Sequence, residues 1–218
     1  MTPAQPRVPL GDPVEGDAVR EAAWEDFGAF GVHDAVRLGG VPSLTDLTDV
    51  TFRDCLVAGA DLGEADLTGT RWENCTVRDL TAVHARATRT GVRHVAASRV
   101  RVGVAELVDA KLSGVVLRGA KIGRLDLSRA TVTDVLLEDV VIEDLDLDGA
   151  RVTRLALRDA RVGRLSLAGA RIKDLDLRTC ALSVVGPLTS LRGVTITPEQ
   201  LTELAPALAA EAGLNVTP

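Results

Sequence analysis

The sequence predicts an all-β solenoid, a rod built from short coils stacked on one another. Apolar residues recur with a strict five-residue period, and aromatic residues make up only 2% of the chain. A period of five fits neither an α-helix, which repeats every 3.6 residues, nor a flat strand, which repeats every two. An interior filled by Leu, Val, Ile and Ala, with almost no aromatics, suits a narrow and regular rod.

The composition is that of a folded protein outside the membrane. The chain has 218 residues, of which 46% are hydrophobic and 26% charged, and this fits one domain with appendages. Its first residues lack the apolar run of a signal peptide, and no stretch reaches membrane-spanning length. Three cysteines are too few for a secreted disulfide framework. We therefore expect a cytoplasmic protein without a membrane segment.

Residues 1–44 are expected to form an N-terminal tail and a capping segment. Val19, Ala23, Phe27 and Phe30 recur at helical spacing, and Trp24 lies among them. A solenoid leaves open strand edges at both ends, and these favour aggregation unless they are covered. This segment is therefore predicted to be a helical cap.

Residues 45–186 carry the repeat. If Leu47 is the middle position of the first five-residue unit, every fifth residue up to Leu182 is apolar, at all 28 positions. The position two residues earlier is Ala, Val, Leu or Cys in 25 of 28 units, and Thr in the other three. Units this short cannot bury their apolar side alone and must stack.

At Ala60–Gly69, "ADLGEADLTG", the sequence resembles the pentapeptide-repeat family, and the resemblance covers roughly two-thirds of the chain. The resemblance implies a right-handed quadrilateral β-helix in which four units make one coil, so that residues 20 apart lie above one another. Two apolar positions per unit then point inward. The residue before the middle position is Asp in only some units, and this departure from the family pattern alters surface charge rather than fold.

The interior of such a rod is expected to be filled and to offer no pocket. The stretch from Ala82 to Val102 has Ala at three middle positions, and it is predicted to be the least filled part of the core.

Residues 187–218 are predicted to form a capping and dimerisation helix. Thr197 suits the N-cap, Pro198 the first helical position and Gln200 a capping box, while Pro206 indicates a kink or two short helices. The resemblance implies dimerisation through this segment, as is common in the family, and the segment has more leucines than one coil end can cover. The candidate homodimer contacts are Leu201, Leu204, Leu208 and Leu214.

No motif indicates catalysis, a cofactor or a metal. "DLDLDG" at 144–149 resembles the start of a calcium loop, but Leu155 stands where the bidentate Glu is needed. Cys55 and Cys75 would stack, and the cytoplasmic expectation makes them reduced core residues rather than a disulfide. We expect a protein that is not an enzyme.

Two outer columns are candidate contact surfaces. The acidic column is interrupted by Arg86 and consists of Asp46, Asp66, Glu106, Asp126 and Asp146. The apolar column, in which Thr76 and Ala96 also lie, is led by Leu56, Val116, Leu136 and Ala156. An apolar stripe suits a protein contact, and it equally suits the β-propensity of an exposed strand.

Three functions remain open. The favoured one is a non-enzymatic, protein-binding rod of unknown partner. The resemblance raises a second, a DNA-mimicking protector or inhibitor of DNA gyrase or topoisomerase, of the quinolone-resistance type. A DNA mimic needs a dominant negative field, whereas residues 45–185 carry 21 acidic and 21 basic side chains, and the net charge of −6 arises in the termini. The third, an enzyme or ion binder, lacks a site. No direct binding to nucleic acid is expected.

Overall fold

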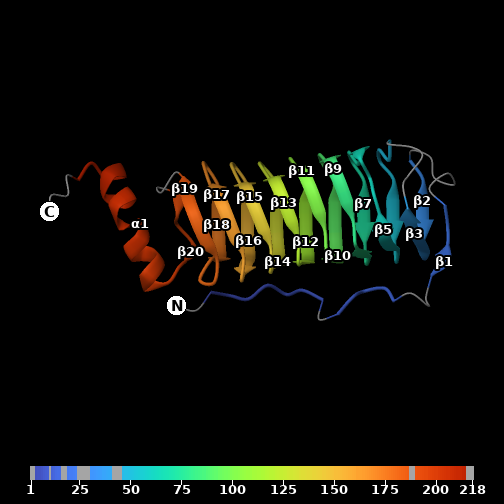
Figure 1. Cartoon of the computed structure of the whole chain (residues 1–218), viewed down its shortest axis with the longest axis horizontal. Coiled ribbons are helices and arrows are strands. Elements are labelled where there is room, and N and C mark those ends of the chain that lie inside the picture. Colours follow the sequence, from blue (N-terminus) through green and yellow to red (C-terminus); the bar gives the residue numbers. More distant parts are fainter. Residues whose placement is uncertain are drawn as a thin grey trace.

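The computed structural model is one parallel β-solenoid with a helix at its C-terminal end (Figure 1). It describes residues 3–9, 11–15, 19–23, 30–40, 46–186 and 190–214, with the backbone alone for 183–185. The all-β solenoid class predicted from the five-residue period is confirmed.

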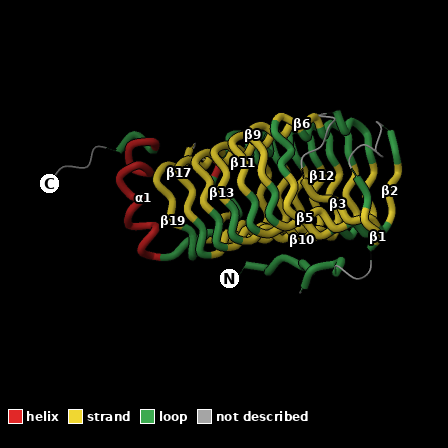
Figure 2. Tube along the Cα trace, turned by 45° about the vertical axis from the view of Figure 1, so that its right-hand side comes forward, coloured by secondary structure: helices red, strands yellow, loops and turns green. Residues whose placement is uncertain are grey.

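The strands stack along the rod and form two sheets that both run in its direction (Figure 2). The larger, 13-stranded sheet contains β1 (Arg20–Glu21), β2 (Val32–Asp34), β3 (Val36–Gly40), β4 (Thr51–Arg53), β5 (Leu56–Ala60), β7 (Arg71–Glu73), β8 (Thr76–Arg78), β10 (Gly91–Ser98), β12 (Lys111–Arg118), β14 (Thr131–Glu138), β16 (Arg151–Arg158), β18 (Arg171–Asp176) and β20 (Val194–Thr195). The seven-stranded sheet contains β6 (Glu64–Asp66), β9 (Thr81–Arg86), β11 (Arg101–Glu106), β13 (Lys121–Asp126), β15 (Val141–Asp146), β17 (Arg161–Ser166) and β19 (Ala181–Gly186).

The register confirms that 20 residues make one coil. Between β4 and β19 each strand pairs in parallel with the strand one coil later, as in Leu112↔Val132 and Leu145↔Leu165. The spacing departs from 20 only near the ends, where Val32 pairs with Thr51 and Leu175 with Val194. Residues 20 apart therefore form continuous columns, inside and outside.

In each coil, three successive turns each place one residue in the left-handed backbone region. These residues lie two positions after a middle position, and they repeat every 20 residues along the rod, as Asp109, Gly114 and Gly119 do. Asp, Asn and Gly occupy most of these positions, because glycine lacks a Cβ and short polar side chains tolerate a positive φ. The turns thus explain why the outward positions are not interchangeable.

The core consists of the inward positions. Leu147, Leu157 and Leu167 are almost fully buried, and Phe52 stacks on Trp72 with ring centroids 4.2 Å apart. The prediction of a completely filled interior is wrong, because a cavity of about 240 Å³ lies between Val77 and Leu155. It is lined only by apolar side chains. It includes part of the stretch predicted to be least filled, and it reaches further toward the C-terminus.

The N-terminal segment continues the solenoid. β2 and β3 precede residue 45 and pair with β4 and β5, while Arg20 of β1 pairs with Val36. The helical cap is therefore wrong for the described residues 19–23 and 30–40, because further strands satisfy the backbone groups of the first coils. Trp24 and Phe27 lie outside the described residues.

Residues 3–9 and 11–15, which we call the N-terminal strap, form neither helix nor strand. The strap follows the lower edge of the rod in Figure 1, from the side of β1 toward the C-terminal coils.

Helix α1 (Pro198–Glu211) lies at the other end of the rod (Figure 1). The predicted capping box is present: Gln200 N donates to Thr197 Oγ1 (3.2 Å), and Thr197 N donates to Gln200 Oε1 (2.8 Å). Gln200 Nε2 also donates to the carbonyls of Leu177 and Cys180, which ties the helix to the last full coil. Pro206 lies inside one continuous helix rather than between two. Among the described residues, no helix has the length and hydrophobicity needed to cross a bilayer.

Candidate interaction surfaces

The acidic column lies in register on the outside of the rod. Asp46 pairs with Asp66, and Glu106 with Asp126, which pairs in turn with Asp146. Four of the five carboxylates also hold a turn, because each accepts the backbone N–H two residues later at 2.9 Å. Structure and surface charge are therefore combined in the same side chains.

Two arginines neutralise much of this column. Arg86 lies between Asp66 and Glu106, at 3.2 and 3.9 Å, and Arg124 lies 3.5 Å from Asp126 and 3.3 Å from Asp146. Burial opposes ionisation of Asp66, but hydrogen bonds from Thr68 and Arg86 hold its pKa below the ordinary value. Burial raises the pKa of Asp146. The negative field of the column is interrupted along its length.

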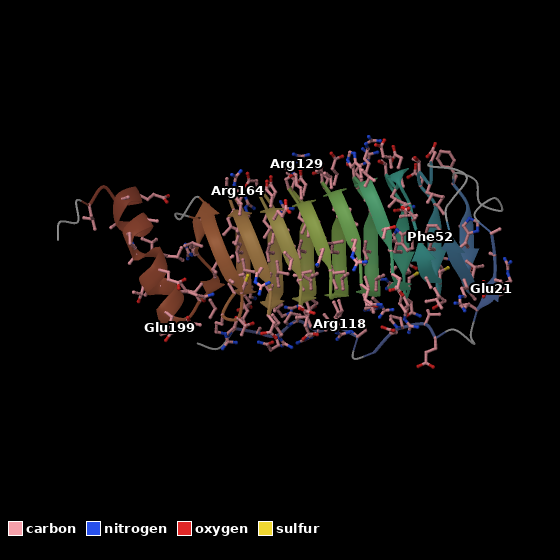
Figure 3. All side chains as sticks on the ribbon, in the orientation of Figure 1. Glu21, Phe52, Arg118, Arg129, Arg164 and Glu199 are labelled. Atoms are coloured by element: carbon pink, nitrogen blue, oxygen red, sulfur yellow. The ribbon has the colours of Figure 1, made fainter. Side chains whose placement is uncertain are left out.

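Other charges pair across coils. At the left-handed turns, Asp79, Asp109 and Asp134 each accept two hydrogen bonds from the arginine 20 residues later, at 2.6–3.0 Å. Arg118 Nε donates one hydrogen bond to Glu138, which lies 20 residues later, at 2.9 Å. Figure 3 places Arg129 at the upper edge of the rod and Arg118 at the lower edge. Inter-coil pairing thus neutralises part of the surface charge of the rod.

The apolar column is not an open surface. Leu56, Val116, Leu136 and Ala156 are each 4% exposed or less, although they point away from the core. Val116, Leu136 and Ala156 form a small hydrophobic cluster of their own, and Val8 of the strap packs against it. The strap therefore covers the central part of this column.

The strap is also held by polar contacts. Arg7 N donates to Asp134 Oδ1 at 2.7 Å, and Val14 N donates to Thr76 Oγ1 at 3.0 Å. Asp12 pairs with Arg78. Gln5 accepts a hydrogen bond from Arg158.

The four leucines proposed as dimer contacts all lie on or beside α1, and none is buried. Leu201 and Leu214 are 51% and 63% exposed, whereas Leu204 and Leu208 are half-buried. The monomer leaves part of this apolar surface open to solvent.

The residues of the calcium-like sequence are used within the rod. Asp148 Oδ1 accepts hydrogen bonds from Ser166 Oγ and Ala168 N, and Arg124 pairs with Asp144 as well as Asp146. No group of three or more His, Cys, Asp or Glu side chains able to hold a metal occurs in the described part of the chain. Cys55, Cys75 and Cys180 are buried free thiols, and burial raises the pKa of Cys180 to about 12.

Comparison with known proteins agrees with this geometry. Residues 45–78 match the family of "Pentapeptide repeats" in eight copies, and the same unit and register continue through β19. Residues 45–78 of this chain are pentapeptide repeats.

Solved structures similar to this chain include QnrB1 (full length), a plasmid-mediated fluoroquinolone resistance protein. The two are 16% identical with a TM-score of 0.41, over 82% of this chain and 99% of that one. Another is HetL, a pentapeptide-repeat protein involved in heterocyst differentiation regulation from the cyanobacterium Nostoc sp. strain PCC 7120. It is 17% identical with a TM-score of 0.26, over 76% of this chain and 87% of that one. No curated protein matches the chain.

Two features of this rod were missed from the sequence. The inter-coil pairs had a signal, since an Asp at a turn is followed 20 residues later by Arg three times. The strap had a weaker one: prolines at positions 3, 6, 9 and 13 favour an extended chain.

Proposed function

We propose that the protein is a non-enzymatic rod that binds other proteins through its outer columns. One observation carries this: the apolar column seats a polypeptide segment, the N-terminal strap, through both apolar and polar contacts. Charged side chains are the groups that catalysis would need, and most of those on the rod are engaged in turns and inter-coil pairs. Free buried thiols suit a reducing compartment, and we place the protein in the cytoplasm.

Affinity capture tests this function. The immobilised full chain, chemically cross-linked to proteins of a host lysate and analysed by mass spectrometry, is expected to give cross-links that start from its outer columns. A matched rod with reversed charges at exposed Arg161 and Lys121 controls for charge-driven background. Capture that is lost with the charge-reversed rod, or cross-links confined to the termini, would count against a binding role of the acidic and apolar columns.

Protection of DNA gyrase is the second candidate. The in-register acidic column and the family resemblance support it, and Arg86 and Arg124 weigh against it. A gyrase supercoiling assay with and without quinolone separates the two functions. Protection that is lost in Asp66→Asn and Glu106→Gln would favour the DNA mimic. No protection at a molar excess of rod would remove it.

We also place a homodimer contact on α1. Burying Leu201 and Leu214 against a two-fold mate would cover the apolar surface that the monomer leaves exposed. Light scattering at micromolar concentration is expected to give twice the monomer mass of 22.9 kDa. Leu201→Glu should return the mass to that of the monomer, whereas the same change at exposed Thr202 should not.

A further inference from the structure

The strap follows the rod axis and crosses the coils. Asp12 contacts Arg78, and Gln5 contacts Arg158, so seven residue-to-residue steps of the strap span four coils. Four coils at strand spacing measure about 19 Å. Seven residues of polyproline II chain measure about 22 Å. An extended, proline-rich segment therefore matches the repeat of the rod without coiling or looping.

The rod side of this contact is an apolar strip flanked by polar groups. Val116, Leu136 and Ala156 supply the apolar strip. Asp134 and Thr76 accept backbone N–H groups of the strap, while Arg78 and Arg158 hold its side-chain oxygens. Side-chain oxygens that accept backbone N–H groups beside an apolar strip suit an extended peptide, and a proline-fixed peptide loses little entropy when it binds.

The strap is held far less firmly than a coil. Adjacent coils share a continuous backbone ladder, as in the seven residue pairs between β12 and β14. Among the described residues of the strap, two backbone N–H groups donate to the rod, those of Arg7 and Val14. Its apolar side chains on the rod are Val8, which is half-buried against the cluster, and Val14, which is 5% exposed. A segment held in this way is open to exchange with a better-fitting one.

We propose that the apolar column is a peptide-binding site for an extended, proline-containing segment of a partner protein, and that the N-terminal strap occupies this site in cis. The inference rests on the proposed protein-binding function and specifies its surface. A tethered strap acts at an effective concentration of millimolar order, so a free partner segment competes poorly until the strap is released. The strap therefore keeps the site closed to weak ligands.

The test uses the full chain and a fluorescent synthetic peptide of residues 3–15 as the probe. Val8→Asp places a charge on the apolar strip and should release the strap in cis. Ala4→Asp adds the same charge at an exposed strap position and is the matched control. By fluorescence anisotropy, the Val8→Asp chain is expected to bind the probe at least tenfold more tightly than the wild type or Ala4→Asp.

A rod-side variant identifies the site. Leu136→Ser, combined with Val8→Asp, should abolish probe binding. Because Leu136 points outward, the melting temperature should stay close to that of Val8→Asp alone. Equal probe affinity for all three strap forms, or no binding to Val8→Asp, would overturn the proposal. Loss of binding to the folded Val8→Asp chain would leave the capture result above untouched, so failure of the site and failure of protein binding are distinguishable.

Light scattering separates cis from trans occupancy. A wild-type mass that is twice the monomer mass and falls to the monomer on Val8→Asp, but not on Leu201→Glu, would mean that a second copy supplies the strap. That outcome would overturn the cis assignment.

Discussion

The C-terminal coils (residues 140–180) and the middle coils (residues 77–137) share one register but differ in packing. Leu145 and Leu147 are fully buried, whereas Val77 and Leu112 retain 9% and 8% of their exposure. The apolar cavity of about 240 Å³ lies largely within the middle coils. The difference follows side-chain volume, because Ala97 and Ala105 occupy inward positions that hold Leu in the following coils.

The comparison shows that periodicity and packing are separable in a solenoid. A five-residue phase aligns the strands whether the inward residue is Ala or Leu, because the backbone ladder sets the register. Side-chain volume then decides how well each coil fills. Since each coil contacts only its neighbours, a weakly packed region limits the stability of the rod locally.

The largest expected effect is unfolding of the C-terminal coils when a charge is buried among them. Leu157→Asp buries an unpaired charge where the side chain is 1% exposed, and this should cost more than about 4 kcal/mol and abolish a cooperative transition. Leu117→Asp, beside the cavity, should cost less, because its side chain is half-buried. Thermal denaturation followed by circular dichroism measures both. Equal losses would contradict the packing difference.

Truncation of a buried leucine to alanine should show the same contrast with a smaller loss of stability. Leu147→Ala creates a new cavity in the C-terminal coils and should cost about 3–5 kcal/mol, whereas Leu112→Ala enlarges an existing one and should cost about 2 kcal/mol. Urea denaturation of both variants gives the two free energies of unfolding. A larger loss at Leu112 would show that the middle coils are not the looser region.

The stability that a charge pair contributes should also increase with its burial. Asp134 and its partner Arg154 are 12% and 23% exposed, while Asp109 and Arg129 are 44% and 62% exposed. Asp134→Asn should cost about 1.5–3 kcal/mol at pH 7, because it weakens hydrogen bonds to a charged group. Asp109→Asn, at an exposed pair, should cost much less.

This pair also predicts a pH dependence. Hydrogen bonds from Arg154 lower the pKa of Asp134 in the folded state. Its contribution is therefore present above the unfolded pKa of about 3.9, and it is lost as the pH falls through the lower, folded value. The stability gap between wild type and Asp134→Asn should close below about pH 4. A gap that is unchanged by acid would show that the pair contributes nothing electrostatic.

The smallest expected effect is a gain in stability. Ala105 lines the cavity, and Ala105→Val should add about 0.5–2 kcal/mol by filling it. Ala150 also occupies an inward position, but it is fully buried, so Ala150→Val should overpack and cost about 1–3 kcal/mol. Melting temperatures that move in the same direction would remove the distinction between the two regions.

The sequence predicts the rod well because one repeated rule governs it. Leu147 and Leu157 are buried for the same reason at every coil, so the core and the 20-residue columns follow from the period alone. The contact of Arg7 with Asp134 spans 127 residues and belongs to no period, and for this reason the covering of the apolar column could not be foreseen. The strands before residue 45 were missed because their spacing near 19 breaks the phase.

The reach of the strap ties the length of the tail to the number of repeats. Duplication of one coil between Arg78 and Arg158 would place these anchors five coils, or about 24 Å, apart. Seven residues reach at most about 25 Å when fully stretched, which proline does not favour. A lineage can therefore add coils freely beyond the anchors, but each coil inserted between them demands a compensating insertion in the tail. The length of the strap therefore limits how many coils can lie between its two anchors on the rod.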